Sequence, residues 1–107
     1  MPDLAFASTI EIAAALRDRK VGALELLDHF LVRCERHNGR VNAIVAWNVE
    51  AARERARAAD AALARGESWG PLHGVPMTIK DSIEVVGMPT TSGAPELHAH
   101  RAGENAP

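Results

Sequence analysis

Apolar side chains recur at helical spacing in the first part of the chain and predict two helices there. Ser8, with Glu11 three residues later, forms a capping-box pattern and predicts a helix that runs to about Lys20. Gly22 is a candidate N-cap for the second helix, and the Asn-Gly pair at 38–39 is expected to close it. Because the link between them is so short, the two helices are expected to pack closely or to cross sharply.

The next part of the chain predicts a third helix and two strands. Residues 41–47 form an apolar, β-branched stretch that is typical of a buried strand. Asn48 is expected to cap a helix that reaches Arg65 and is terminated by Gly66. Residues 75–80 alternate apolar and polar side chains, which predicts a second strand. The pattern therefore indicates the α/β fold class, with three helices and two or more short strands.

The length of 107 residues fits a single domain. We expect residues 8–66 to be mainly helical with one strand, and residues 67–97 to hold the second strand and a loop. Residues 98–107 follow neither period and are expected to form a loop or tether. Aromatic residues make up only 4% of the chain, so few large side chains are available for a core. We therefore expect an incomplete domain that self-associates when it is isolated.

Charge and composition narrow the class of partner and the compartment. The chain has 12 basic and 14 acidic residues and a formal charge of −2, which provides no basic surface for nucleic acid or an anionic membrane. Its longest apolar runs, 12–16 and 43–47, are far shorter than the ~20 residues of a membrane helix. The single cysteine, Cys34, lies on the apolar stripe of a helix and excludes an internal disulfide. These features favour a cytoplasmic protein.

Lys80 is the leading candidate for chemistry. A lysine that ends an apolar strand lies where open α/β sheets place their sites, at the carboxyl end, although a solvated lysine shows the same pattern. To act as a base, its amine would have to be neutral, which requires a dry pocket or nearby cations. Asp81 would alternate to the opposite face of the strand, so an ion pair between the two residues is not required.

Other polar side chains form weaker patterns. Ser82 follows Lys80 by two residues and could form a Ser-Lys nucleophile pair, and Ser92 lies in a polar turn, but both fit ordinary turn or strand serines better. A metal site can be drawn from four residues, His73, His98, His100 and Glu104. Their spacing lacks a known metal-binding pattern, so no metal and no cofactor is expected.

The stretch GPLHGVPMTIKDSIEVVGMPTTSG at residues 70–93 joins a glycine-rich lead-in, an apolar segment ending in Lys-Asp and a Gly-x-Pro-Thr-Thr turn. This combination resembles the opening segment of the amidase signature family. The upstream helices resemble the N-terminal region of that family, so the resemblance extends from about Ser8 to Leu97. Ala94 departs from it, because many relatives have serine after the glycine. The resemblance implies that residues 1–107 are the incomplete N-terminal part of an amidase domain.

The resemblance also implies a reaction. Members of that family hydrolyse carboxylic amides with a Ser-cisSer-Lys triad, and the lysine matched here is Lys80. It would take a proton from a bridging serine, which activates a nucleophilic serine toward a small-molecule amide. Ser82 and Ser92 match neither family serine, so the isolated chain is expected to be inactive without the C-terminal part of the domain. Two alternatives stay open: the amidase subunit of a tRNA-dependent amidotransferase, and a non-enzymatic helical interaction module.

Overall fold

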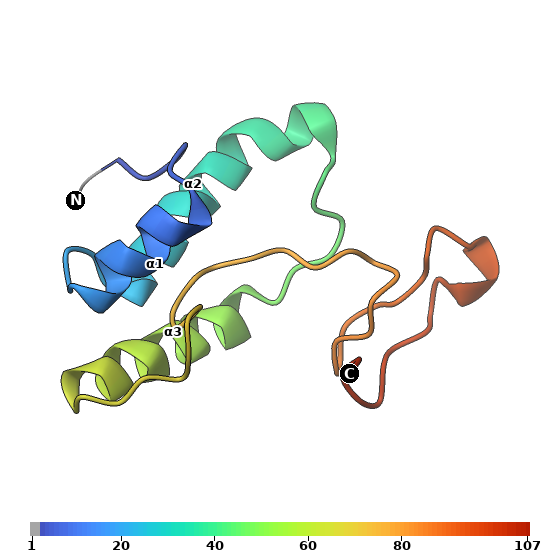
Figure 1. The fold of residues 1–107 in the computed structure, drawn as a ribbon. Coiled ribbons are helices and arrows are strands. Elements are labelled where there is room, and N and C mark those ends of the chain that lie inside the picture. Colours follow the sequence, from blue (N-terminus) through green and yellow to red (C-terminus); the bar gives the residue numbers. More distant parts are fainter. Residues whose placement is uncertain (1–2) are drawn as a thin grey trace. The chain divides into compact units, whose positions relative to one another are not determined.

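The computed structural model describes residues 3–107, which divide into two compact parts (Figure 1). The first, here called the helical unit, comprises Met1–Ala43 and Val49–Pro76. The second, here called the loop unit, comprises Ile44–Asn48 and Met77–Pro107. Apolar packing between helices holds the first unit together, whereas turns and single bridges hold the second.

The helical unit contains the three predicted α-helices, which are confirmed: α1 (Thr9–Arg17), α2 (Ala23–Val41) and α3 (Val49–Ala64). α1 begins at the predicted capping box. The hydroxyl of Ser8 accepts a hydrogen bond from the N–H of Glu11 at 3.2 Å, and the N–H of Ser8 donates to Oε2 of Glu11 at 2.7 Å. In the part of the chain that the structure describes, no helix is long and apolar enough to cross a membrane.

α2 continues past the Asn-Gly pair at 38–39 that was expected to close it. It ends at Asn42, which has a left-handed backbone with φ of 49° and donates its N–H to the carbonyl of Asn38 at 2.6 Å. Asparagine tolerates this conformation better than most residues, so Asn42 provides the termination. As a consequence, Val41 belongs to the helix and not to the strand predicted from that position.

α3 ends at the predicted glycine. Gly66 has φ of 78°, and its N–H donates to the carbonyl of Leu63 at 3.0 Å. The N–H of Glu67 donates to the carbonyl of Ala62 at 2.9 Å, which completes a Schellman motif. Glycine adopts a positive φ without steric cost, so this position both stops the helix and satisfies its last carbonyls.

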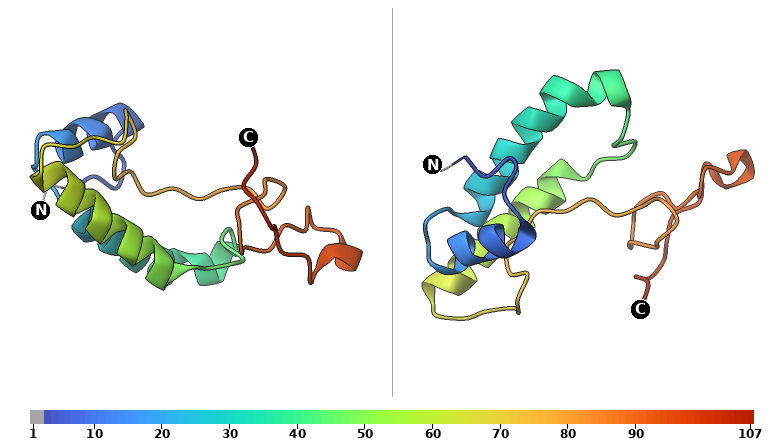
Figure 2. Two further views of the ribbon diagram at one scale, coloured as in Figure 1. Left: turned by 90° about the horizontal axis from the view of Figure 1, so that it is seen from below. Right: turned by 45° about the horizontal axis from the view of Figure 1, so that its top comes forward.

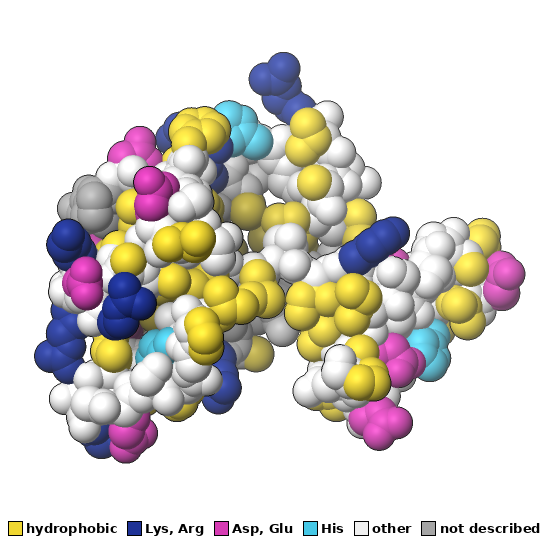
Figure 3. Space-filling view, in the orientation of Figure 1, with side chains coloured by type: hydrophobic (Ala, Val, Ile, Leu, Met, Phe, Trp, Pro, Cys, Tyr) yellow, Lys and Arg dark blue, Asp and Glu magenta, His cyan; other side chains and the backbone are white. Residues whose placement is uncertain are grey.

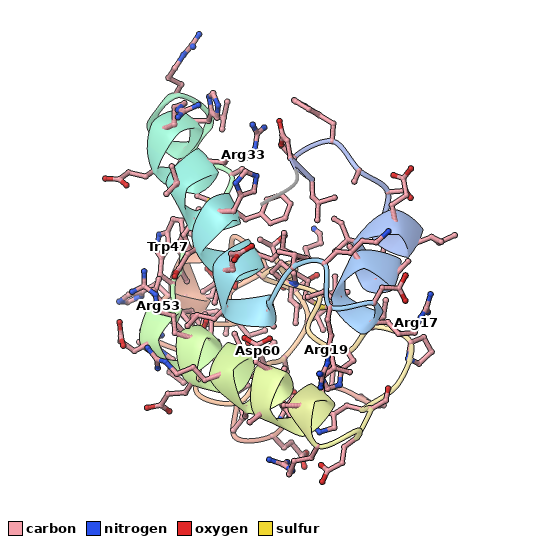
Figure 4. All side chains as sticks on the ribbon, turned by 90° about the vertical axis from the view of Figure 1, so that its left-hand side faces the viewer. Arg17, Arg19, Arg33, Trp47, Arg53 and Asp60 are labelled. Carbon is pink, nitrogen blue, oxygen red and sulfur yellow. The ribbon has the colours of Figure 1, made fainter. Side chains whose placement is uncertain are left out.

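The start of α2 is stabilised by a side chain from α3. Gly22, the N-cap residue, has no side chain that could accept a hydrogen bond, and Asp60 takes over this role (Figure 4). Its carboxylate accepts from the N–H of Ala23 at 2.6 Å and from the N–H of Leu24 at 3.2 Å. A carboxylate at a helix N-terminus satisfies unpaired donors and interacts favourably with the helix dipole. Asp60 therefore joins the two helices through a cap that is remote in sequence.

A small apolar core lies among the three helices, and α2 packs against α3 (Figure 2). Leu26 is completely buried in it. The other core residues are mostly small: Ile12, Ala15, Leu16, Val21, Ala23, Ala56 and Ala59. Two polar contacts reinforce this packing, because Arg53 pairs with Asp28 at 3.0 Å and Arg19 donates to the Leu63 carbonyl at 2.6 Å.

The segment after α3 folds back onto that helix. The ring of Trp69 lies 4.0 Å from the guanidinium carbon of Arg55 and 4.8 Å from the ring of His73. Nδ1 of His73 accepts the N–H of Trp69 at 2.9 Å, and its Nε2 lies 2.8 Å from the carbonyl of Ala59. A carbonyl can only accept, so Nε2 is the donor. His73 is therefore a bridge between the segment and α3.

The two strands predicted at 41–47 and 75–80 are wrong: among residues 3–107 neither segment forms one. A strand requires a ladder of hydrogen bonds to a neighbour, and the described residues supply none for these segments. Their apolar side chains are exposed where burial was expected, with 65% of Val45, 48% of Trp47 and 61% of Met77 accessible. Figure 3 shows apolar side chains, in yellow, on the surface of the molecule. The three predicted helices are therefore confirmed, and the two or more short strands of the predicted α/β class are absent from residues 3–107.

Turns and single bridges hold the loop unit together, along with the short 3-10 helix η1 (Pro95–Leu97). The N–H of Gly87 donates to the carbonyl of Ala102 at 3.0 Å, and the N–H of Ala102 donates to the carbonyl of Met88 at 3.3 Å. Two isolated bridges form there within the described residues, Val86 with Ala102 and Pro89 with Arg101. Of the described residues of this unit, only Ala102 and Thr90 are buried.

Candidate functional site

Lys80 lies at a turn and not at the end of a strand. The N–H of Ile83 donates to the carbonyl of Lys80 at 3.0 Å, which closes a tight turn over residues 80–83. The lysine side chain is exposed, and it forms no hydrogen bond or ion pair with any residue from 3 to 107. The dry surroundings that a neutral amine requires are therefore not supplied by the described residues.

The carboxylate of the next residue, Asp81, is held by Thr91. The Thr91 hydroxyl donates to Oδ2 of Asp81, and the Thr91 N–H donates to Oδ1 at 2.9 Å. The carbonyl of Asp81 accepts from the N–H groups of Thr91 and Ser92, both at 3.1 Å. We call this set of hydrogen bonds the Asp81–Thr91 clamp. It joins the Lys-Asp pair of the sequence motif to the Thr-Thr turn of the same motif.

Thr91 is fixed in turn by the residues that follow it. The N–H of Gly93 donates to the Thr91 hydroxyl oxygen at 3.2 Å, and the N–H of Ala94 donates to the Thr91 carbonyl at 2.8 Å. Ser92 and Gly93 both have left-handed backbones, with φ of 52° and 73°. This geometry directs successive N–H groups toward Asp81 and Thr91, so backbone donors add to the hydrogen bond that the Thr91 hydroxyl donates to the Asp81 carboxylate.

The clamp determines the electrostatics of Asp81. The hydrogen bond from the Thr91 hydroxyl lowers the pKa of Asp81 most, the Thr91 N–H and the positive charge of Lys80 lower it further, and burial opposes them. Asp81 and Lys80 form no ion pair within 4 Å in the described part of the chain. Thr91 thus favours the ionised form of the Asp81 carboxylate, and no ion pair joins this carboxylate to Lys80 in the described part of the chain.

The two candidate serines line an open groove of about 670 Å³ in the loop unit. Glu84 and His100 line the same groove, and Oε1 of Glu84 lies 3.5 Å from Nε2 of His100. Within residues 3–107, neither Ser82 nor Ser92 forms a hydrogen bond to the amine of Lys80. The Ser-Lys pair suggested by two-residue spacing is therefore not assembled.

The histidines considered as metal ligands have other contacts. His73 bridges the segment after α3 to that helix, and Nδ1 of His98 lies 3.0 Å from the carbonyl of Pro95. Across the residues that the structure describes, there is no group of three or more His, Cys, Asp or Glu that could hold a metal ion. Cys34 is a free, half-buried thiol in α2.

Sequence spacing alone does not pair Asp81 with Thr91. Ten residues separate them, and no helix or strand periodicity relates their positions. The available signal was the occurrence of Lys-Asp and Thr-Thr within one motif, which indicated a shared site without showing the contact.

Comparisons with known proteins agree on one family. The Amidase family model matches residues 25–107. The chain is 44% identical over 92 residues to a glutamyl-tRNA(Gln) amidotransferase subunit of Bdellovibrio bacteriovorus, and the match covers 86% of this chain and 19% of that protein. It is 37% identical over 103 residues to an amidase of Pseudomonas putida, and this match covers 94% of this chain and 22% of that amidase. An indoleacetamide hydrolase of Bradyrhizobium diazoefficiens is 37% identical over 100 residues, and this match covers 94% of this chain and 19% of that hydrolase.

Solved structures are similar to the chain as well. One belongs to a vestigial protein complex described as revealing the evolutionary origins of an s-triazine catabolic enzyme. Its TM-score is 0.86 at 29% sequence identity, and the match covers 92% of this chain and 22% of that one. A second structure, described as an amidase, has a TM-score of 0.73 at 40% sequence identity. This match covers 78% of this chain and 19% of that one. The chain thus spans about a fifth of the length of the curated relatives and solved structures it matches.

Proposed function

Because the chain belongs to the amidase family, we propose that Lys80 is the general base of an amide-hydrolysing site. The observation that carries this proposal is the position of Lys80. It lies in the family-matched residues 25–107, within the Lys-Asp motif, on a turn fixed by the clamp. Its side chain forms no ion pair in the described part of the chain, so no carboxylate there stabilises the ammonium against the neutral amine that a general base requires.

In the proposed reaction, the neutral Lys80 amine accepts the proton of a bridging serine, which takes the proton of a nucleophilic serine. The nucleophilic oxygen attacks the amide carbonyl carbon and the C–N bond breaks, while the leaving nitrogen receives the proton that Lys80 returns through the bridging serine. Water then hydrolyses the acyl-enzyme, while backbone N–H groups stabilise the oxyanion. We assign both serines to polypeptide outside residues 1–107, since Ser82 and Ser92 match neither family position.

Residues 1–107 alone are proposed to be inactive. The Lys80 side chain is exposed, and the dry environment of a neutral amine would come from the rest of a family-length domain. Exposed apolar side chains, including Val45 and Met77, support the further proposal that the isolated chain self-associates. Analytical ultracentrifugation over a concentration series tests this, and a monomer at every concentration would contradict it.

Two reaction classes are compatible with the relatives. Amidase and indoleacetamide hydrolase are names of hydrolases, and they support our first proposal, hydrolysis of a small-molecule amide. The 44% identity to the Bdellovibrio amidotransferase supports a second candidate, in which the same site releases ammonia within a complex. Membership in the family argues against the third interpretation, a non-enzymatic helical module.

A chimeric enzyme tests the proposal. Residues 25–107 replace the matching segment of the Pseudomonas putida amidase, and a parallel chimera uses the Bdellovibrio amidotransferase. We expect an active amidase chimera, and we expect Lys80→Ala to lower its kcat by ~10²-fold or more, the usual effect of a positioned acid-base group. The matched control is Lys20→Ala, at an exposed lysine in the loop between α1 and α2. It is placed in chimeras that are extended to include residue 20. If Lys80→Ala keeps more than about half of the rate, the role of Lys80 is wrong.

Comparison of the two chimeras addresses the reaction class. The recipient enzyme, amidase or amidotransferase, in which the segment restores more of the native rate indicates that class.

A further inference from the structure

We propose that Thr91 and Asp81 are positioning residues for Lys80, and that the Thr91 hydroxyl is the group that makes the turn at residues 80–83 rigid enough for proton transfer. This inference rests on the proposed function of Lys80. It assigns to the Thr-Thr turn a task in catalysis that involves no contact with substrate. The assignment comes from the geometry of the clamp.

The first step of the argument is mechanical. Lys80 is attached to a single tight turn, closed by one hydrogen bond from Ile83. A turn held at one point leaves the lysine backbone free to pivot. The clamp adds a second point of attachment, because both the carboxylate and the carbonyl of Asp81 accept hydrogen bonds from Thr91. A misplacement of about 1 Å can lower a catalytic rate by ~10²-fold, so this second attachment has kinetic consequences.

The second step concerns charge. Asp81 is the carboxylate nearest to Lys80 in the chain, and a salt bridge between them would lock the ammonium and oppose its loss of a proton. Thr91 occupies both carboxylate oxygens of Asp81. The clamp therefore holds the carboxylate on Thr91 and not in a direct ion pair with Lys80, which would stabilise the ammonium most strongly.

The third step is a contrast between neighbours. Thr90 and Thr91 are the same residue type at adjacent positions, yet only the Thr91 hydroxyl bonds to Asp81. The hydroxyl of Thr90 is buried and has no hydrogen-bond partner among residues 3–107, with 8% of the residue exposed. Replacing Thr90 by valine removes an unsatisfied buried hydroxyl and is expected to be neutral or slightly stabilising. Thr90→Val is therefore a matched control for Thr91→Val.

The experiment compares three variants in the active amidase chimera: Thr91→Val, Thr90→Val and Thr91→Ser. We expect Thr91→Val to lower kcat roughly tenfold or more with little change in KM, because the role proposed for the clamp involves no contact with substrate. Thr90→Val should stay near the parent rate, and Thr91→Ser, which keeps the hydroxyl, should recover most of it. Circular dichroism melts establish that all three variants are folded.

A second measurement uses the 107-residue chain itself. The ¹³Cγ signal of Asp81 is followed during acid titration in the parent, Thr91→Val and Thr90→Val. We expect the pKa of Asp81 to rise toward its ordinary value only in Thr91→Val, because the hydroxyl is the largest cause of its depression.

The outcomes separate the two proposals. If Lys80→Ala abolishes activity while Thr91→Val and Thr90→Val behave alike, the positioning role is wrong and the role of Lys80 stands. If Lys80→Ala has no effect, or if the parent chimera is inactive, the proposed function fails, and the clamp is then judged by the titration of Asp81. An Asp81 that titrates identically in Thr91→Val and in the parent overturns the clamp in either case.

Discussion

The two units of this chain are stabilised in opposite ways. The helical unit buries apolar side chains against one another, with Leu26 fully enclosed, and it completes its helices with remote contacts such as the Asp60 cap. The loop unit buries only Ala102 and Thr90 among its described residues, and its order comes from turn hydrogen bonds and the Asp81–Thr91 clamp. Function is assigned to the unit with the smaller core. Its geometry therefore depends on hydrogen bonds more than on packing, a common property of binding and catalytic loops.

The largest expected difference between the units is in their response to loss of an apolar side chain. Leu26→Ala should destabilise the helical unit by about 2–5 kcal/mol, because it leaves a cavity in a close-packed core. Ile79→Ala in the loop unit, where half of the side chain is exposed, should cost less than about 1 kcal/mol. Urea unfolding followed by circular dichroism measures both. Equal losses would contradict the distinction between the units.

A smaller effect is expected from the remote cap. Asp60→Ala removes the acceptor of the Ala23 and Leu24 N–H groups and should cost about 1–2 kcal/mol, as other N-cap losses do. Glu54→Ala, at an exposed position on the same helix, is the control. Faster amide exchange confined to the first turn of α2 would support the assignment. A stability equal to that of Glu54→Ala would show that Asp60 contributes nothing as a cap.

The smallest effect concerns acid. Folding lowers the pKa of Asp81, so this carboxylate stabilises the folded structure at pH values above its unfolded pKa of ~4. The stabilisation is lost as the pH falls through the lower, folded pKa. We expect amide exchange at Thr91 and Ser92 to accelerate in that range, and Asp81→Asn to show no such acceleration. An unchanged profile in Asp81→Asn would mean that another group controls these amides.

Local signals predicted the helical unit well, and physical reasons explain where prediction failed. The Ser8 capping box and the Gly66 terminator act within a few residues of the elements they define, so they are visible in sequence. The Asp60 cap joins positions far apart in the chain, and no local pattern indicates it. The apolar-polar alternation at 75–80 is typical of a strand but contains no information about a pairing partner, and without a partner residues 77–80 are exposed irrespective of their type.

The role of Lys80 stays a prediction. Lys80 is a candidate because its motif is contiguous in the sequence, whereas its surroundings depend on folding that brings Thr91 to Asp81. The left-handed backbone at Ser92 that directs the N–H groups is also hidden in sequence, since serine rarely adopts it.

The two tryptophans fall on opposite sides of the division between the units, Trp47 in the loop unit and Trp69 in the helical unit. Both indoles are partly exposed, and Trp69 also lies against the guanidinium of Arg55 and the ring of His73. The chain thus carries one intrinsic fluorophore for each unit. Trp47→Phe and Trp69→Phe would each leave a single emitter, so the melting of the two units can be recorded separately without an attached dye.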